Sequence, residues 1–310
     1  MLELKPDQTR QYIDAVAVFE ALEEARSEAR STQGGMYWHA GPTHNRAATY
    51  LVRTSRTGAE KSLGARSPET EQIYERFMAR KRDNGERVLA LTQQLEQHRR
   101  LNRALRVGRV EPLVVKLLSK LAATGLMDHF RVVGTHALYA YETAAGVRLD
   151  TGVLSTRDID LLWDTQKRVI FATRLARVDS SMLGVLKKVD PSFRLRKSQL
   201  YTAVNQDGFE VDIIRRMKVG GDDHPIKLSK AEEDFYVVQA PEAHKLLYTA
   251  GFSQVLVATD GTMARMNTLN PQAFIRFKRW MASHPDRDPL KSRRDALQAD
   301  AVQQLVDRYL

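Results

Sequence analysis

The sequence predicts an α+β fold, with a mixed β-sheet core flanked by an N-terminal helical hairpin region and a C-terminal helical region. Apolar residues recur every three or four positions in both flanking regions, which is the period of an amphipathic helix. The middle of the chain instead contains short runs of β-branched and aromatic residues, which are typical of strands. The chain has 310 residues, enough for one or two domains with a sizeable core.

The N-terminal region, residues 1–110, is predicted to be mainly helical. Its first helix presents Tyr12 and Phe19 on one face, and its second begins with Ser67 as N-cap and Pro68 at the first helical position. Polar residues interrupt the apolar stripe of the second helix, so a helical hairpin arm is favoured over a coiled coil. Helices are predicted over residues 7–31 and 67–105, and short strands or extended segments over 35–38 and 49–54.

The core region, residues 111–225, contains most of the predicted strands. Its clearest local signal is Asn205–Gly208, which joins two apolar runs and contains Asp-Gly, a dipeptide typical of a tight hairpin turn. Helices are predicted over residues 113–126 and 135–143, and strands over 130–133, 158–163, 201–204 and 209–215. The third region, residues 226–310, carries predicted helices over 271–283 and 289–309, and further strands are predicted between residues 216 and 260.

Charge and residue types exclude several classes of function. The 48 Lys and Arg against 38 Asp and Glu give a net charge of +10, which favours polyanionic partners such as nucleic acid; a solvated Arg-rich surface is the alternative. The absence of cysteine excludes disulfides, zinc-thiolate sites and cysteine nucleophiles. The sequence shows neither a signal peptide nor a run of about 18 apolar residues, so we expect no membrane partner and a cytoplasmic location.

Two aspartates stand one residue apart in the apolar run Asp158-Ile159-Asp160-Leu161-Leu162. Because side chains alternate along a strand, both carboxylates lie on one face and repel each other. The usual relief is a hard divalent cation held by oxygens, typically Mg²⁺. Asp212 on another predicted strand would complete such a site, which suits metal-assisted transfer of a nucleotidyl group from a nucleoside triphosphate. The alternative is a set of strand-end acids that face solvent.

A glycine turn precedes these acids. In Val132-Val133-Gly134-Thr135 a strand ends before a predicted helix, and backbone N–H groups at such a turn can approach a phosphate; an ordinary turn with Thr as cap is the alternative. Residues 130–215 thereby resemble the core of the nucleotidyltransferase superfamily, which has the DNA polymerase β-like fold. That family has a hydrophobic residue and Gly followed by Gly or Ser, then paired acids on a strand and a later third Asp. The matching positions are Gly134, Thr135, Asp158, Asp160 and Asp212.

The resemblance implies a stand-alone bacterial nucleotidyltransferase that uses Mg²⁺ (or Mn²⁺) in a two-metal mechanism. Asp158 and Asp160 would bridge the metals, and Asp212 would bind the catalytic metal and help to deprotonate the acceptor hydroxyl. Gly134 and Thr135 would hold the β- and γ-phosphates of the NTP. In related enzymes a C-terminal helical module carries basic residues that reach the triphosphate. The positions assigned to that role here are Lys291 and Arg294; a solvated face with ion pairs is the alternative.

Further residues are candidates for nucleotide or RNA contacts. Arg157 pairs either with Asp212 or with a phosphate, or is simply a charge at the start of a strand. A basic loop over residues 61–68 suits a phosphate or RNA-backbone clamp through Lys61, Ser62 and Arg66, and an exposed loop is the alternative.

Aromatic residues and one histidine leave two interpretations each. His136 either touches a phosphate or the acceptor, or is a structural residue at the start of a helix. Tyr37, Trp38 and Tyr50 either stack on bases beside the arginines or form a small satellite core.

The predicted function is a metal-dependent enzyme that moves an NMP from an NTP to a hydroxyl acceptor. The basic charge and the Arg-rich helical arm favour RNA as the acceptor, for example a tRNA 3′ end. A protein hydroxyl, as in AMPylation, and a small molecule are the alternatives. The rival from another class is a nucleic-acid-binding protein without catalysis.

Overall fold

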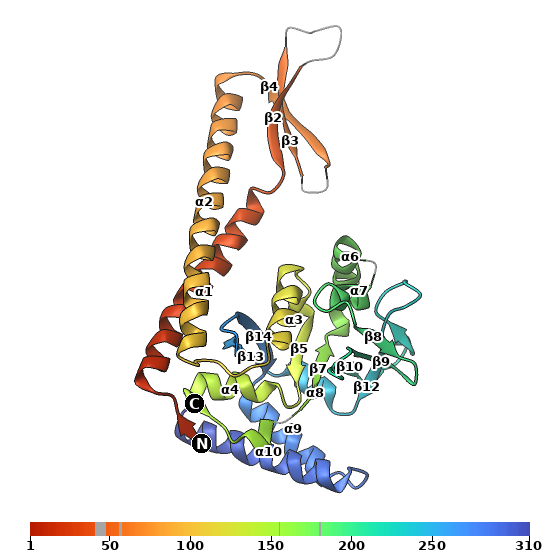
Figure 1. Cartoon of the computed structure of the whole chain (residues 1–310). Coiled ribbons are helices and arrows are strands. Elements are labelled where there is room, and N and C mark those ends of the chain that lie inside the picture. The colour runs from red at the N-terminus through yellow and green to blue at the C-terminus, as the bar shows by residue number, and fades with distance from the viewer. Residues whose placement is uncertain (41–47, 56–57, 155, 180) are drawn as a thin grey trace. The chain divides into compact units, whose positions relative to one another are not determined.

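A computed structural model describes residues 1–40, 48–55, 58–154, 156–179 and 181–310. It divides into two compact units, coloured by residue number in Figure 1. The smaller unit is Arg10–Leu101, and the larger unit joins Met1–Thr9 to Asn102–Leu310. The three regions predicted from the sequence are therefore distributed over two units.

The smaller unit contains the predicted helical hairpin. Helix α1 (Pro6–Ser31) begins at a proline and ends before the positive-φ residue Gly34, and it buries Ala15, Phe19 and Leu22. Helix α2 (Pro68–Ala104) runs antiparallel to it. Gln11 near the start of α1 hydrogen-bonds His98 near the end of α2, whereas Glu24 and Glu28 pair with the earlier α2 residue Arg87 at 3.0 and 2.7 Å.

A three-stranded antiparallel sheet completes this unit. Its strands pack on α2 through a small core around Met36, Leu51 and Phe77, and their bounds are β2 (Gly35–Ala40), β3 (Thr49–Thr54) and β4 (Glu60–Ala65). The prediction of a loop over residues 61–68 was wrong, because residues up to Ala65 pair with β3. This strand is an exposed edge, so polar residues and Gly64 occupy positions where buried strands carry apolar ones.

The larger unit is built on a nine-stranded sheet. The strand order is β11-β12-β10-β7-β5-β14-β13, with β9 beside β10 and β8 beside β9. The pairing of β10 with β7 is parallel and that of β5 with β7 is antiparallel, which confirms the predicted mixed sheet. The bounds are β5 (Phe130–Val133), β7 (Asp158–Trp163), β8 (Arg194–Arg196), β9 (Gln199–Val204), β10 (Glu210–Arg216), β11 (Ile226–Lys227), β12 (Tyr236–Ala240), β13 (Gly251–Val257) and β14 (Met263–Leu269); β1 (Leu2–Glu3) pairs with β6 (Val147–Arg148) apart from this sheet.

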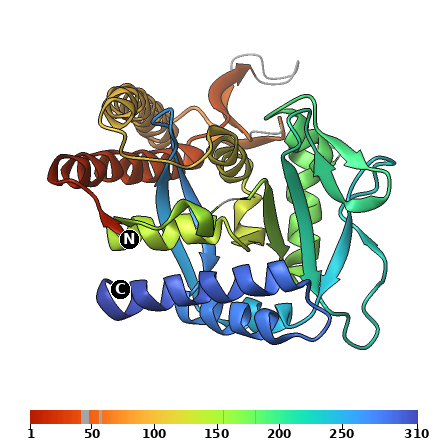
Figure 2. The same cartoon turned by 60° about the horizontal axis from the view of Figure 1, so that its bottom comes forward.

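Two hydrophobic cores lie on the two faces of this sheet. Alternate residues Ile159 and Leu161 of β7 face a core with α3, α6 and α7, whereas Leu162 faces one with α4, α9 and α10. Figure 2 shows α10 beside α9 and close to α4. The helix bounds are α3 (Pro112–Ala123), α4 (Ala137–Ala145), α5 (Thr151–Leu154), α6 (Arg168–Val178), α7 (Met182–Lys187), α8 (Ala243–Tyr248), α9 (Pro271–Ser283) and α10 (Pro289–Arg308), and short 3₁₀ helices are η2 (Met127–His129) and η3 (Thr165–Lys167).

Most elements predicted for this unit are confirmed. The Asn205–Gly208 turn joins β9 to β10 with Gly208 at φ 78°, and proline begins both C-terminal helices. The sequence prediction lacked α6, and the strands expected after residue 216 extend to Leu269 and belong to the central sheet. Among the residues that the structure describes, no helix is long and apolar enough to span a bilayer.

Candidate active site

The three predicted aspartates meet on one face of the central sheet. Asp212 of β10 lies beside Asp160 of β7 in the parallel register, and Asp158 stands two residues earlier on β7. Each carboxylate offers an oxygen atom, and these atoms lie within 4.8 Å of one another. The two strands need only their regular pleat to bring the acids together, because residues of equal parity share a face.

The electrostatic cost of this arrangement falls mainly on Asp160. Burial, and secondarily the charges of Asp158 and Asp212, raise the pKa of Asp160 to about 7, while Lys278 and Arg294 oppose this effect. Burial also raises the pKa of Asp212. The site therefore disfavours a full set of three negative charges unless a cation binds there.

Hydroxyl groups donate hydrogen bonds to two of the three carboxylates, those of Asp158 and Asp212. The Thr202 hydroxyl on β9 donates to Asp212 Oδ1 at 2.5 Å, and it opposes the burial effect on the Asp212 pKa. The Thr156 hydroxyl donates to Asp158 Oδ1. One oxygen of each carboxylate thus keeps its lone pairs available for another ligand.

The turn between β5 and α4 lies directly against these acids. Gly134 has φ 70°, in the left-handed region that favours glycine, and Val133 pairs with Asp160. A Cβ atom at Gly134 would come within 2.2 Å of Asp160 Oδ2. Gly134 is therefore required both by the backbone conformation and by the carboxylate that packs on it. Thr135 follows it and is 4% exposed.

His136 fixes the turn to the strand of the acids. Its Nδ1 lies 2.9 Å from the carbonyl oxygen of Asp158, and because a carbonyl only accepts, the imidazole N–H must donate. Burial lowers the pKa of His136 to about 4, so the ring is neutral near physiological pH. Of the two interpretations from the sequence, the structural one fits this buried ring.

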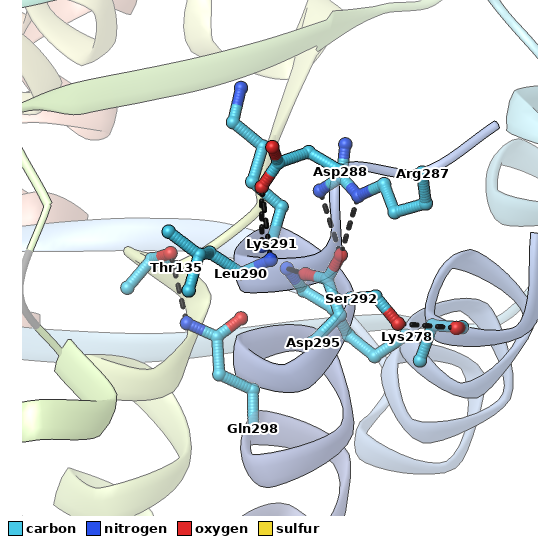
Figure 3. A network of polar contacts seen from close by, with 10 residues as sticks. Thr135, Lys278, Arg287, Asp288, Leu290, Lys291, Ser292, Asp295 and Gln298 are labelled. Atoms are coloured by element: carbon cyan, nitrogen blue, oxygen red, sulfur yellow. Dashed lines mark hydrogen bonds and ion pairs between the residues drawn. The ribbon is translucent and has the colours of Figure 1, made fainter.

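A charge cluster on α9, α10 and the turn between them acts on Asp160 through Lys278. Figure 3 shows Asp295 of α10 between Lys278 and Arg287, with Lys278 Nζ at 2.6 Å from Oδ1 and Arg287 nitrogens at 2.9 and 2.7 Å from Oδ2. Asp295 is fully buried and Lys278 is 4% exposed. Two cations share one anion here, which leaves a positive balance on the side of the sheet that carries the acids.

Helix α10 also brings two further polar residues to the site. Arg294 affects the Asp160 pKa, and its Nε is buried without a partner among the described residues. Gln298 donates from Nε2 to the Thr135 hydroxyl at 3.0 Å. Sequence reasoning did not single out Gln298 or Asp295. Lys291 stands at the exposed start of α10, where its backbone N–H is capped by Asp288.

Comparison with protein families decides the class of this site. The model of a nucleotidyltransferase family matches residues 113–310, which is well over half of the chain. The chain belongs to this nucleotidyltransferase family. Comparison with curated proteins and with solved structures gives no match. The resemblance inferred from the glycine turn and the acids is thereby confirmed.

The acids of this nucleotidyltransferase suit a divalent metal. Three carboxylates supply hard oxygen ligands, and the absence of a Cβ at Gly134 lets Asp160 Oδ2 pack directly against the turn. Burial and the two neighbouring carboxylates raise the pKa of Asp160, so a cation bound beside them would offset the cost of their negative charges.

The other predicted nucleotide ligands of this nucleotidyltransferase lie apart from the acid cluster or have other partners. Arg157 donates to the carbonyl of Asp207 at 3.1 Å. Pairing with Asp212, one of its three interpretations, is not seen, and Asp212 Oδ1 instead accepts from Thr202. Lys61, Ser62 and Arg66 belong to the smaller unit, outside the family match.

The surface around these three residues has its own contacts. Arg66 pairs with Glu71 at 2.7 Å and lies over the Trp38 ring at 5.2 Å. Trp38 packs against the small core of that unit, as the satellite-core interpretation predicts. Tyr37 stands on the opposite strand face and donates to Glu60 at 2.7 Å.

Proposed function

We propose that this protein is a Mg²⁺- or Mn²⁺-dependent nucleotidyltransferase that transfers an NMP from an NTP to a hydroxyl group of RNA. The observation that carries the proposal is the convergence of Asp158, Asp160 and Asp212 within 4.8 Å, against a glycine turn on which the Asp160 carboxylate packs. Family membership supports nucleotidyl transfer in general.

The three aspartates would hold the metal. When bound, a divalent ion supplies Lewis-acid stabilisation of the charge that develops on the phosphate oxygens. Asp158 and Asp160 each present oxygens on the same strand face. Asp212 uses Oδ1 to accept from Thr202, which leaves Oδ2 to orient the acceptor hydroxyl and to take its proton.

The triphosphate would lie between the glycine turn and α10. The backbone N–H groups at Gly134 and Thr135 and the N-terminus of α4 favour negative charge. Arg294 supports this placement, because a buried guanidinium N–H without a protein partner is satisfied by a phosphate oxygen. Lys291, one turn earlier on α10, would contact the outer phosphate, and Arg157 would shift from the Asp207 carbonyl to the bound nucleotide.

An acceptor nucleotide would bind in a cleft near β10, the strand that carries Asp212. The cleft has a volume of about 300 Å³ and is lined by Leu200, Tyr201, His224 and the β12 residues 236–239. Its residues Leu200 and Tyr201 belong to β9, and both β9 and β12 pair with β10. Two tyrosines in the lining suit stacking on a base, and Lys227 lies 5.5 Å from the Tyr236 ring.

The net charge of +10 supports RNA over a neutral small molecule. In the smaller unit, Lys61 and Ser62 of β4 and Arg66, which follows it, would contact the RNA backbone, because all three residues are exposed. A protein hydroxyl is the second candidate acceptor, and the same assay distinguishes the two.

The test is incubation of the purified protein with NTPs labelled at the α-phosphate, Mg²⁺ or Mn²⁺, and total cellular RNA. The variant Asp158→Asn removes one proposed metal ligand, and Asp207→Asn is the control at an exposed aspartate in the β9–β10 turn. Label in RNA that is lost in Asp158→Asn and kept in Asp207→Asn supports the proposal. Label in protein moves the acceptor to a protein hydroxyl. Full transfer by Asp158→Asn contradicts the proposal. Absence of transfer by the wild type also contradicts it, and steep salt-dependent RNA binding without transfer would favour the nucleic-acid-binding alternative.

A further inference from the structure

Gln298 is a fully buried polar residue that joins two segments of the candidate site. It lies on α10 and is 0% exposed. Its Nε2 donates to the Thr135 hydroxyl at 3.0 Å, drawn in Figure 3, and to the carbonyl oxygen of Val153 at 2.9 Å. Thr135 belongs to the glycine turn, and Val153 belongs to α5, in the segment that leads to Asp158. One side chain thus hydrogen-bonds both the glycine turn and α5.

The orientation of the Gln298 amide follows from its partners. A backbone carbonyl only accepts, so the end of the amide that faces Val153 must be the NH₂ group. The same nitrogen reaches Thr135, and its two hydrogens are then both used. If the Gln298 amide were flipped, its Oε1 would face the carbonyl oxygen of Val153, and two acceptors would meet without a hydrogen between them.

This orientation decides what the Thr135 hydroxyl does. A hydroxyl has one hydrogen to donate and two lone pairs that accept. Gln298 supplies the hydrogen of the Gln298–Thr135 hydrogen bond, so the hydroxyl hydrogen of Thr135 is not used in it. No described residue accepts that hydroxyl hydrogen. Thr135 is 4% exposed, so this hydrogen needs a partner that enters the site from outside the protein.

Two more buried atoms lack partners in the same place. Gln298 Oε1 and Arg294 Nε are both buried without a hydrogen bond among the described residues. They stand four positions apart on α10, which puts them on one face of the helix. Unpartnered polar atoms in a buried place point to a ligand with its own polar groups.

We propose that Gln298 is a positioning residue for the triphosphate: it holds the Thr135 hydroxyl as a donor toward a phosphate oxygen. This inference rests on the proposed function, and it deepens it by assigning a role to a residue outside the recognised motifs. Gln298 itself does not touch the reacting atoms. It acts through Thr135, and its second hydrogen bond, to the carbonyl oxygen of Val153, fixes the amide in the orientation that this role needs.

Calorimetric binding of inorganic triphosphate with Mg²⁺ tests the proposal, because this probe needs no knowledge of the base or the acceptor. Gln298→Met keeps the side-chain length and removes both hydrogen bonds, and Thr135→Val removes the hydroxyl at similar shape. We expect each to weaken binding about 10-fold, because hydrogen bonds to charged groups are the strong ones. The double variant should also lose about 10-fold rather than about 100-fold, because both changes remove one interaction. Thr135→Ser keeps the hydroxyl and should bind like the wild type.

Matched controls separate positioning from a structural role. Gln304→Met changes an exposed glutamine of the same helix and should bind normally. A structural role alone would lower the melting temperature of Gln298→Met without changing affinity per folded molecule. Wild-type affinity in Gln298→Met, or additive losses in the double variant, overturns the inference and leaves the proposed function standing. Failure of the wild type to bind Mg²⁺-triphosphate overturns both. Mg²⁺-dependent binding that Asp158→Asn abolishes and Gln298→Met leaves intact overturns the inference alone.

Discussion

Replacing Asp160 by Asn should stabilise the metal-free protein at about pH 8, although it removes a proposed metal ligand. Burial and two neighbouring carboxylates raise the pKa of Asp160 from 3.8 to about 7. Between these values the native state keeps a proton that the unfolded chain has lost, so the free energy of unfolding falls as the pH rises. Above about pH 7 the full penalty is present. Asn has nearly the same shape and no charge, so it removes the penalty.

The size of the effect follows from the pKa. A change from 3.8 to about 7 corresponds to at most about 4 kcal/mol. Asp160 keeps some contact with solvent, and the variant also loses the attraction of Lys278 and Arg294 for the charge. We therefore expect a gain of about 1–2 kcal/mol, or about 2–4 °C in melting temperature.

Thermal unfolding of both proteins in EDTA, at about pH 4.5 and about pH 8, measures this gain. The gain should be present at the higher pH and nearly absent at the lower one. Asp207→Asn, at an exposed aspartate, should show no such pH dependence. Adding Mg²⁺ should stabilise the wild type and reduce the difference, because an ion that binds the native state raises its stability. A gain of equal size at both pH values, or a loss at the higher pH, would refute the reasoning.

Three further predictions concern the surroundings of the site. Gly134→Ala should lower the free energy of unfolding by about 2–4 kcal/mol and abolish transfer, because its Cβ would lie 2.2 Å from Asp160 Oδ2. Gly208→Ala is the control, since Gly208 also has positive φ but has open space around it, and it should cost about 1 kcal/mol. Equal urea midpoints for the two variants would contradict the prediction. Burial lowers the pKa of His129, so the free energy of unfolding of the wild type falls as the pH drops below about 6.5. His129→Phe should lose less stability than the wild type between about pH 7 and about pH 5. Equal losses of stability in the two proteins over this range would contradict the prediction. Asp295→Asn leaves the buried Lys278 and the partly exposed Arg287 without their anion, and it should lower the free energy of unfolding by about 3–5 kcal/mol. An unchanged urea midpoint would contradict this prediction.

The parts of the site that local patterns specify were predictable. An Asp-x-Asp in an apolar run places two carboxylates on one face whatever the tertiary structure. Asp-Gly at residues 207–208 predicts the hairpin that carries Asp212 into register. Gly134 is required by a turn whose conformation few other residues adopt.

The parts that depend on distant partners were not predictable in this way. From the sequence alone, Gln298 is one of several polar positions on an amphipathic helix. Its partner Thr135 is 163 residues away in the chain, so no local pattern indicates their hydrogen bond. Asp295 lies in a dense charge run, where local pairing with a helical neighbour is the simplest expectation. The edge strand β4 is rich in polar residues because it is largely exposed to solvent. A loop has the same composition, so the sequence pattern does not distinguish the two.

The position of β5 in the sheet has a consequence for synthesis of the chain on the ribosome. The strand β14 covers one edge of β5, and the Thr268 hydroxyl bonds the Val132 carbonyl across 136 residues of sequence. At 5–20 residues per second, roughly 7–30 s pass between the emergence of these two strands. The strands β7 and β10, which carry the three aspartates, are made in that interval, while the edge of β5 is still unpaired. Newly made chains are therefore open to aggregation, and to chaperones that bind extended segments, at the strand that leads into the glycine turn.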